Sequence, residues 1–176
     1  MDILVLKKTP NRGYGLFAAR DIHKEEQIFH VDLTSLRKYT LDELEKHPEL
    51  DGDHADYAGH GKYVIDNSLR CYINHSCDPN CIYKMKSIPV KDLFARRDIR
   101  AGEELTHDYT ATAVDQFAGE AHWVLIFRCG SGDCRRQVTG AFLEMPAEWQ
   151  AKYYPNLPPS IKRRHRERFV NLHPKK

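Results

Sequence analysis

The chain is organised around residues 72–81, where amide, imidazole, hydroxyl, thiol and carboxylate groups are crowded in the order Tyr-Ile-Asn-His-Ser-Cys-Asp-Pro-Asn-Cys. Asn74 and His75 can each donate and accept hydrogen bonds. The Asp-Pro-Asn that follows predicts a turn, because proline fixes φ and asparagine tolerates unusual backbone angles. Taken alone, the stretch fits a polar loop between two buried cysteines equally well, so the rest of the chain has to decide.

Two further stretches accompany this one. Residues 11–18 read Asn-Arg-Gly-Tyr-Gly-Leu-Phe-Ala, and residues 99–109 read Ile-Arg-Ala-Gly-Glu-Glu-Leu-Thr-His-Asp-Tyr. In this order and at these separations, the three stretches resemble the signatures of the SET-domain lysine methyltransferases. The resemblance extends over residues 3 to about 140 and is far more specific than a lone glycine motif. It implies a SET-domain fold, in which the chain end threads past the loop around Asn74 and His75 in a knot-like manner.

The pattern along the chain predicts a mostly β (α+β) fold of small curved antiparallel sheets. Strand patterns occupy residues 3–6, 14–18, 27–31, 63–66, 81–85 and 90–95, separated by frequent turns. Thr40 and Glu43 form the capping box of a short helix over 40–46, whereas residues 48–62 show little periodicity and predict an irregular segment. Near the end, Pro146 can open a helix through Tyr153, and Ser160 can cap a basic helix over 161–169.

These signals divide the chain into three parts. Residues 1–126 are expected to form the SET domain, with an irregular insert at about 32–62. Residues 127–145 are expected to form a segment like the cysteine cluster that follows many such domains. Residues 146–176 are expected to form a basic helical extension. With 176 residues and 41% apolar content, the chain can bury one real core.

No apolar run approaches membrane-spanning length, and the first residues are too short and wrongly ordered for a signal peptide. The expected location is therefore cytoplasmic for a prokaryotic source, and nuclear or cytoplasmic otherwise, without membrane contact.

Charge is distributed unevenly. Residues 151–176 hold eight Lys or Arg against one acid, a balance of +7, while the remainder holds 19 basic and 24 acidic residues, a balance of −5. An acidic body suits a basic peptide or protein partner that contains lysine. The basic segment could contact nucleic acid, although no aromatic-rich single-strand platform accompanies it and a solvated tail is the favoured interpretation.

The resemblance implies that the chain transfers methyl groups from S-adenosylmethionine to the amine of a lysine, as in a histone or histone-like tail. Tyr109 would stand at the transfer point. His107, in a position where Phe or Tyr commonly borders the lysine channel, would affect how many methyl groups are added. The residues implied to bind the cosubstrate are Arg12, Gly13, Tyr14, Gly15, Tyr57, Asn74, His75 and Tyr109.

Such a transfer is an in-line displacement, so the protein has to align the reacting atoms, exclude water and present the amine without its proton. An apolar channel and an adjacent sulfonium charge both lower the pKa of the amine from its ordinary value of about 10.4. No protein nucleophile is required. A cysteine or serine hydrolase is disfavoured, because His75, Ser76 and Cys77 are sequence neighbours and adjacency is not the geometry of a dyad.

Five cysteines are an odd number without a secretion signal, which favours thiol or metal chemistry over disulfides. The resemblance implies that Cys77, Cys129 and Cys134 could bind zinc. Phe127 fills the place of a further cysteine, so the set is incomplete, because structural zinc takes four ligands. Cys71, Cys81 or a histidine could supply the fourth. Without metal, packing of Phe127, Val138 and Phe142 could close the channel.

Two other functions remain open at this level. One is a catalytically silent module that binds lysine peptides, in which His107 has removed activity. The other is a zinc-dependent nucleic-acid-binding protein, which the incomplete cysteine set disfavours. The loop histidines His47, His54 and His60 match no compact ligand set and are expected to be solvated.

Overall fold

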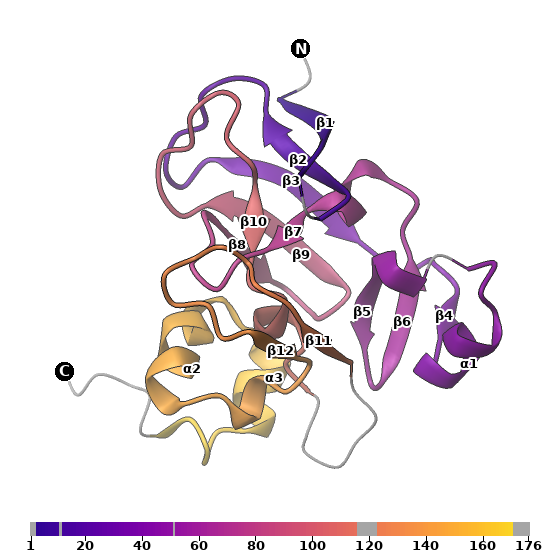
Figure 1. The fold of residues 1–176 in the computed structure, drawn as a ribbon. Coiled ribbons are helices and arrows are strands. Elements are labelled where there is room, and N and C mark those ends of the chain that lie inside the picture. Colours follow the sequence, from indigo (N-terminus) through magenta and orange to yellow (C-terminus); the bar gives the residue numbers. More distant parts are fainter. Residues whose placement is uncertain (1–2, 11, 51, 116–122, 171–176) are drawn as a thin grey trace.

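Short strands dominate the computed structural model, which describes residues 3–10, 12–50, 52–115 and 123–170 (Figure 1). Its strands are β1 (Leu4–Lys8), β2 (Tyr14–Ala18), β3 (Gln27–Asp32), β4 (Lys38–Tyr39), β5 (Ala55–Gly59), β6 (Lys62–Ile65), β7 (Asn74–His75), β8 (Cys81–Met85), β9 (Val90–Ala95), β10 (Thr106–His107), β11 (Val124–Ile126) and β12 (Gln137–Thr139). Its α-helices are α1 (Leu41–Lys46), α2 (Ala147–Tyr153) and α3 (Pro159–Arg164).

The described strands form several separate small sheets. Two have three strands each, in the orders β3-β9-β8 and β4-β6-β5, and the pairs β1-β2, β7-β10 and β11-β12 complete the set. Apart from the β7-β10 pair, neighbouring strands run antiparallel. The predicted β-rich class is therefore confirmed. Buried aliphatic side chains from β2, β9 and the turns around them, such as Leu16, Leu93 and Ile99, contribute to one core.

Local signals located several elements correctly. β8 and β9 are paired strands, as the two apolar runs and the intervening turn predict, and their register runs from Cys81↔Ala95 to Met85↔Lys91. The capping box of α1 is present in full, because the Thr40 side chain accepts from the Glu43 N–H and the Glu43 carboxylate accepts from the Thr40 N–H. Both groups otherwise left unpaired at the helix start are thereby satisfied.

The expectation of an irregular segment over residues 48–62 is wrong for its second half. Residues 55–59 form β5, which pairs with β6 through Ala55↔Ile65 and Tyr57↔Tyr63. His60 and Gly61 connect the two strands, and both have positive φ, 55° and 66°. A two-residue loop of this kind matches the natural twist of a hairpin. The hairpin was missed because histidine is an unusual residue at the first of these positions.

β7 and β10 pair in parallel, although the strands are separated by about thirty residues, with partners Thr106↔Asn74 and His107↔His75. A parallel pair needs a long connection. The second and third sequence motifs therefore lie side by side, as the resemblance to the SET fold implies. Figure 1 shows β7 and β10 next to each other, above α2 and α3 in this view.

The C-terminal helices differ from expectation in detail. α2 begins directly after Pro146, as predicted, but α3 begins at Pro159, so Ser160 lies inside the helix and does not cap it. Proline suits a first helical position because its fixed φ fits the helix and it has no N–H to leave unpaired. α3 also ends at Arg164 and not at Phe169.

The part of the basic extension that the structure describes is tied to the core. Tyr153, Leu157, Ile161 and Phe169 are all buried there. Over the described residues, none of the helices is both long and apolar enough to cross a bilayer.

Candidate active site

One carboxylate joins the three sequence motifs. Glu104 accepts a hydrogen bond from the Asn74 side chain at 2.8 Å and forms an ion pair with Arg12. Arg12 also donates to the main-chain oxygen of His75 at 3.3 Å. Its partners are 30 and 92 residues distant in sequence, so Glu104 connects the three motifs through long-range contacts. We call this set of contacts the Glu104 clasp. Glu104 lies within a quoted motif, but its role was not predicted, since only the fold brings these partners together.

The glycine turn approaches this clasp closely. The Asn74 amide donates to the Tyr14 carbonyl at 3.0 Å as well as to Glu104, so it holds the turn in place from the other side. A Cβ atom on Gly15 would lie 2.6 Å from Glu104 Oε1 and 2.9 Å from Asn74 Nδ2. Gly13 has a positive φ of 69°. Gly15 is therefore required for close approach, and Gly13 for backbone conformation.

We expect Gly15→Ala to lower the free energy of unfolding by about 1–3 kcal/mol, as for other overpacked sites, because Glu104 and Asn74 both have to move. Urea unfolding measures this change. Gly132→Ala is the matched control, since its added Cβ would meet no described atom within 4 Å. Equal stability of the two variants would contradict the close-approach role.

Tyr109 is held at both ends. It begins the 3₁₀ helix Tyr109–Thr112, whose N-cap Asp108 accepts from the Thr110 N–H. The Tyr109 N–H donates to His75 Nδ1 at 3.2 Å, and its hydroxyl donates to the Ile73 carbonyl at 3.0 Å. Burial raises the pKa of Tyr109 well above its usual value, so the phenol stays protonated at neutral pH.

Two cavities meet at Tyr109. The first has a volume of about 300 Å³ and the second about 390 Å³. Both are lined by Tyr109, together with His54, Cys71 and Leu125. The second cavity is the one that contains most of the residues expected to bind the cosubstrate; its other lining residues are Arg12, Gly13, Tyr14, Tyr72, Asn74, His75 and Phe127.

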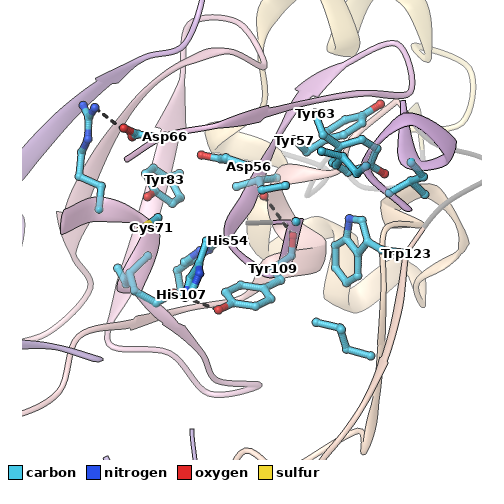
Figure 2. A pocket seen from close by; sticks show the side chains of 18 residues that line it. His54, Asp56, Tyr57, Tyr63, Asp66, Cys71, Tyr83, His107, Tyr109 and Trp123 are labelled. Atoms are coloured by element: carbon cyan, nitrogen blue, oxygen red, sulfur yellow. Dashed lines mark hydrogen bonds and ion pairs between the residues drawn. The ribbon is translucent and has the colours of Figure 1, made fainter. Parts of the chain in front are cut away.

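The first cavity is aromatic and acidic (Figure 2). Figure 2 shows Tyr109 and Trp123 beside each other, with ring centroids 6.4 Å apart in an edge-on arrangement, and the Asp56 carboxylate nearby. Asp56 forms an ion pair of 2.8 Å with Lys91, whose side chain is only 1% exposed. The Asp56 carboxylate is thus already paired, and a lysine side chain entering this cavity would meet mainly aromatic faces.

Gly15 and Tyr57 are the two residues expected to bind the cosubstrate that are absent from the lining of the second cavity. Tyr57 lines the first cavity instead. Its buried hydroxyl donates to Asp115, and the His60 N–H donates to the same carboxylate at 3.0 Å. The described contacts of Tyr57 thus hold the β5–β6 hairpin, and its contact with a cosubstrate stays a prediction.

His107 lines the first cavity and has one buried nitrogen without a described partner. Its ring lies 4.9 Å from the ring of Tyr83 and 5.0 Å from that of Tyr109, between centroids. Its Nδ1 is buried and has no hydrogen-bond partner among the described residues. Burial, and then the charge of Lys91, hold the pKa of His107 well below its usual value. A neutral imidazole with an open nitrogen is suited to receive a polar group of a ligand or water.

We expect the free energy of unfolding of His107→Phe to fall less than that of wild type when the pH is lowered from 7 to 5. In the unfolded chain this histidine binds a proton below about pH 6.5, whereas the folded chain resists protonation, so the free energy of unfolding falls as pH drops through that value. Phenylalanine removes this contribution, which is at most about 1.4 kcal/mol per pH unit for one proton. Urea unfolding between pH 7 and pH 5 measures it. Identical slopes for variant and wild type would show that His107 titrates normally in the folded chain.

Cys77, Cys129 and Cys134 come together and are called the cysteine cluster here. Each sulfur accepts a backbone N–H: Cys77 from Arg135 at 3.4 Å, Cys129 from Cys77 at 3.5 Å, and Cys134 from Cys129 at 3.3 Å. Although burial opposes it, hydrogen bonding from Ser131 lowers the pKa of Cys129 to about 6. Thiolates are the form that binds zinc. Within the part of the chain that the structure describes, the Cys134 sulfur does not belong to the group of ligand atoms that lie within 4.8 Å of one another, so the three sulfurs do not form a compact site for that metal.

A fourth cysteine ligand is missing from this arrangement. Among the described residues, the group found close enough to share an ion with the cluster is His75, since its ring and the sulfurs of Cys77 and Cys129 offer ligand atoms within 4.8 Å of one another. The cluster therefore places three sulfurs near one imidazole, and burial raises the pKa of the Cys77 thiol to about 11, so this sulfur keeps its proton at neutral pH. Phe127 occupies the place of the missing cysteine and packs edge-on against the His75 ring, 5.5 Å between centroids.

A buried ion pair behind Tyr109 was not predicted. The Asp108 carboxylate is fully buried and accepts two hydrogen bonds of 2.7 Å from the guanidinium of Arg135. The Tyr153 hydroxyl of α2 also lies 3.4 Å from it. Asp108 precedes Tyr109 in the third motif, and Arg135 follows Cys134 in the cysteine segment, so that the position of the segment is coupled to that of Tyr109.

Comparison with known proteins agrees with this arrangement. A family model described as "SET domain" matches residues 13–110, a range that begins in the glycine turn and ends just after Tyr109. A Plasmodium falciparum protein, putative histone-lysine N-methyltransferase 1, is 32% identical over 141 residues, covering 74% of this chain and 2% of that protein. The Drosophila melanogaster histone-lysine N-methyltransferase trr is 32% identical over 145 residues, covering 74% of this chain and 6% of that protein.

A shorter relative is the probable histone-lysine N-methyltransferase set-23 of Caenorhabditis briggsae, which is 38% identical over 85 residues, or 44% of this chain and 33% of that protein. The chain thus spans a small part of the length of the curated relatives it matches. The matched range takes in Gly13, Glu104 and Tyr109, three residues that the structure brings to one site. On these grounds the chain belongs to the SET-domain family.

Proposed function

We propose that this chain is an S-adenosylmethionine-dependent protein-lysine N-methyltransferase, which methylates the side-chain amine of lysine in a basic protein such as a histone or histone-like tail. The observation that carries this proposal is the place of Tyr109 at the junction of two cavities. The relatives named as histone-lysine N-methyltransferases support it. The acidic balance of the chain outside its C-terminal segment also supports a basic substrate.

The second cavity is where the cosubstrate would bind, beside Arg12, Gly13, Tyr14, Asn74 and His75. When bound, S-adenosylmethionine supplies a methyl group on a positively charged sulfur. Gly13 keeps the backbone beside this cavity free of a side chain, whereas Gly15 lets the turn approach Glu104 and Asn74. Arg12 and Asn74 are already engaged with Glu104, so their main role here is to hold the turn rigid before a ligand arrives.

The first cavity would receive the lysine. Its aromatic walls can pack along the aliphatic stem of the lysine and exclude water. Exclusion of water disfavours the charged ammonium and therefore promotes the neutral amine that transfer requires. At the junction, the protonated hydroxyl of Tyr109 can orient the reacting groups. His107 would contribute its open Nδ1 as an acceptor for the amine or for a water molecule beside it.

The direct test incubates the chain with histones and S-adenosylmethionine carrying an isotope-labelled methyl group. We expect label on lysine, located by mass spectrometry of peptides. A synthetic peptide spanning the labelled site, and the same peptide with that lysine replaced by arginine, form a matched pair. Binding of the peptide without turnover would instead support the silent peptide-binding module. Failure to bind S-adenosylmethionine, together with no transfer to any basic protein, would refute the proposal.

A finer proposal concerns the C-terminal basic segment, which we propose makes a secondary contact with nucleic acid. In its described part, Lys162 donates to the Pro155 carbonyl and Arg168 to that of Leu143, so these two cations fasten the segment to the body. Arg163 and Arg164 of α3 are exposed and could contact phosphates. Their change to Gln should reduce the logarithmic salt slope of duplex DNA binding by about 2. An unchanged slope would refute this contact.

A histone substrate would place the protein with chromatin in an organism that has a nucleus. Immunofluorescence of the native protein tests this location, and its absence from nuclei would argue against histones as the substrate.

A further inference from the structure

The imidazole of His75 lies between the cysteine cluster and Tyr109. Its side chain is fully buried, and each ring nitrogen has one close partner. Nε2 lies 3.1 Å from the Cys77 sulfur, and Nδ1 lies 3.2 Å from the backbone nitrogen of Tyr109. The ring of Tyr109 and the ring of Phe127 both meet it edge-on, at 5.3 Å and 5.5 Å between centroids. The ring is thus held in one orientation.

The backbone decides which nitrogen carries the proton. The Tyr109 N–H can only donate, so the Nδ1 that faces it has to be the unprotonated nitrogen. A neutral imidazole then carries its hydrogen on Nε2, which points at the Cys77 sulfur. Burial raises the pKa of the Cys77 thiol to about 11, so its sulfur accepts that hydrogen bond as a thiol, and a metal-bound thiolate would accept it more strongly.

The same tautomer argues against His75 as a zinc ligand. A histidine that binds metal through one nitrogen almost always donates the hydrogen on its other nitrogen to a carboxylate, carbonyl or water. Here the other nitrogen faces a donor, and the nearest carboxylate oxygen, on Asp108, is 3.8 Å away. A metal on Nε2 would therefore require the Tyr109 backbone contact to be lost. The proximity of His75 to the cysteine cluster therefore indicates a role other than metal binding.

We propose that His75 is a positioning residue, whose ring transmits the state of the cysteine cluster to Tyr109 through two hydrogen bonds, from Nε2 to the Cys77 sulfur and from the Tyr109 N–H to Nδ1. Zinc bound at the cysteine cluster would keep the Cys77 sulfur charged and in place, and so strengthen the chain of contacts to Tyr109. The catalytic consequence rests on the proposed function. The hydrogen-bond chain itself does not.

Two substitutions separate the two hydrogen bonds. In His75→Asn, the amide oxygen can take the place of Nδ1 and keep the acceptor for Tyr109, while the contact with Cys77 is lost. In His75→Gln, the amide nitrogen can take the place of Nε2 and keep the donor to Cys77, while the acceptor is lost. We expect the Asn variant to retain a kcat about tenfold above that of the Gln variant, because it still holds the Tyr109 backbone.

The decisive measurement needs no activity and no variant that has to fold. Nitrogen NMR of the wild-type chain labelled on histidine should show the His75 ring protonated on Nε2. A ring protonated on Nδ1 overturns the proposal. Cys77→Ser should shift the His75 ring signals and the Tyr109 amide signal, whereas Ser87→Ala, in the turn between β8 and β9 and outside the lining of both cavities, should leave them in place. Unchanged signals in a folded Cys77→Ser protein also overturn the proposal.

Metal analysis distinguishes a His75 that bridges Cys77 and Tyr109 by hydrogen bonds from a His75 that binds zinc. With zinc added, His75→Asn and His75→Gln should bind the same amount of metal per chain as wild type. Loss of metal in both variants, where wild type binds it, would make His75 the fourth ligand and overturn the bridge. If the chain transferred no methyl groups while the NMR result held, the proposed function would fail and the bridge would stand.

Discussion

Tyr109→Phe should lower kcat for methyl transfer by about 10²–10³-fold, the range measured when a single positioned donor is removed from an active site. Only the hydroxyl is deleted, and it lies where the two cavities meet. The same hydroxyl donates to the Ile73 carbonyl at 3.0 Å, so its loss leaves that carbonyl unpaired and should cost about 1 kcal/mol of stability. Steady-state kinetics and urea unfolding measure the two effects.

Binding of S-adenosylmethionine to the Tyr109→Phe variant should remain close to that of wild type, because the second cavity keeps its other lining residues. Isothermal titration calorimetry tests this separation. Tyr39→Phe removes a hydroxyl from β4, in a side chain that lines neither cavity, and serves as the control. A kcat of Tyr109→Phe within threefold of the control would remove Tyr109 from the transfer step.

Arg135→Met should lower the free energy of unfolding by about 3–5 kcal/mol, the usual cost of breaking a buried ion pair from one side. The Asp108 carboxylate is fully buried and takes two hydrogen bonds from this guanidinium. In the variant, its remaining hydrogen-bond donors among the described residues are the Tyr153 hydroxyl at 3.4 Å and the Thr110 N–H at 3.2 Å. Urea unfolding measures the loss. Arg136→Met is the matched control, because Arg136 is the exposed neighbour.

The double variant Asp108→Asn with Arg135→Met should be more stable than Arg135→Met alone, because the buried charge is no longer present. A double-mutant cycle gives the coupling between the two residues. A loss of less than about 1 kcal/mol in Arg135→Met would show that Asp108 finds water instead, and that the cysteine segment does not hold Tyr109 through this pair.

Local sequence patterns predicted much of the secondary structure. Turn residues and apolar runs predicted β8 and β9 as paired strands, and the Thr40 and Glu43 spacing predicted the start of α1. Each of these features depends on residues close in sequence, where backbone conformation and hydrogen bonding are decided by immediate neighbours. The β5–β6 hairpin escaped detection because its loop places His60 at positive φ, which is rare for this residue.

In the candidate site, too, some features could be predicted from the sequence and others could not. The three motifs could be located from their residue types, and with them Tyr109, Asn74 and the cysteines of the cluster. The role of Glu104 could not be predicted, because its partners, Arg12 and Asn74, are far from it in the sequence. The bidentate contact of Arg135 with Asp108 could not be predicted either, because the sequence does not show which arginine lies beside this carboxylate in the folded chain.

The order of residues established a β-rich chain of the SET family, with a glycine turn, a polar central motif and an incomplete set of zinc ligands. The folded chain decided where these parts meet: two cavities joined at Tyr109, a glutamate that clasps three motifs, and a histidine bridging the cysteine cluster and the tyrosine backbone. The physical reason is the parallel pairing of β7 with β10, a long-range contact whose stability comes from burial and hydrogen bonds across the whole core. Periodicity within a few residues carries no information about such a pairing.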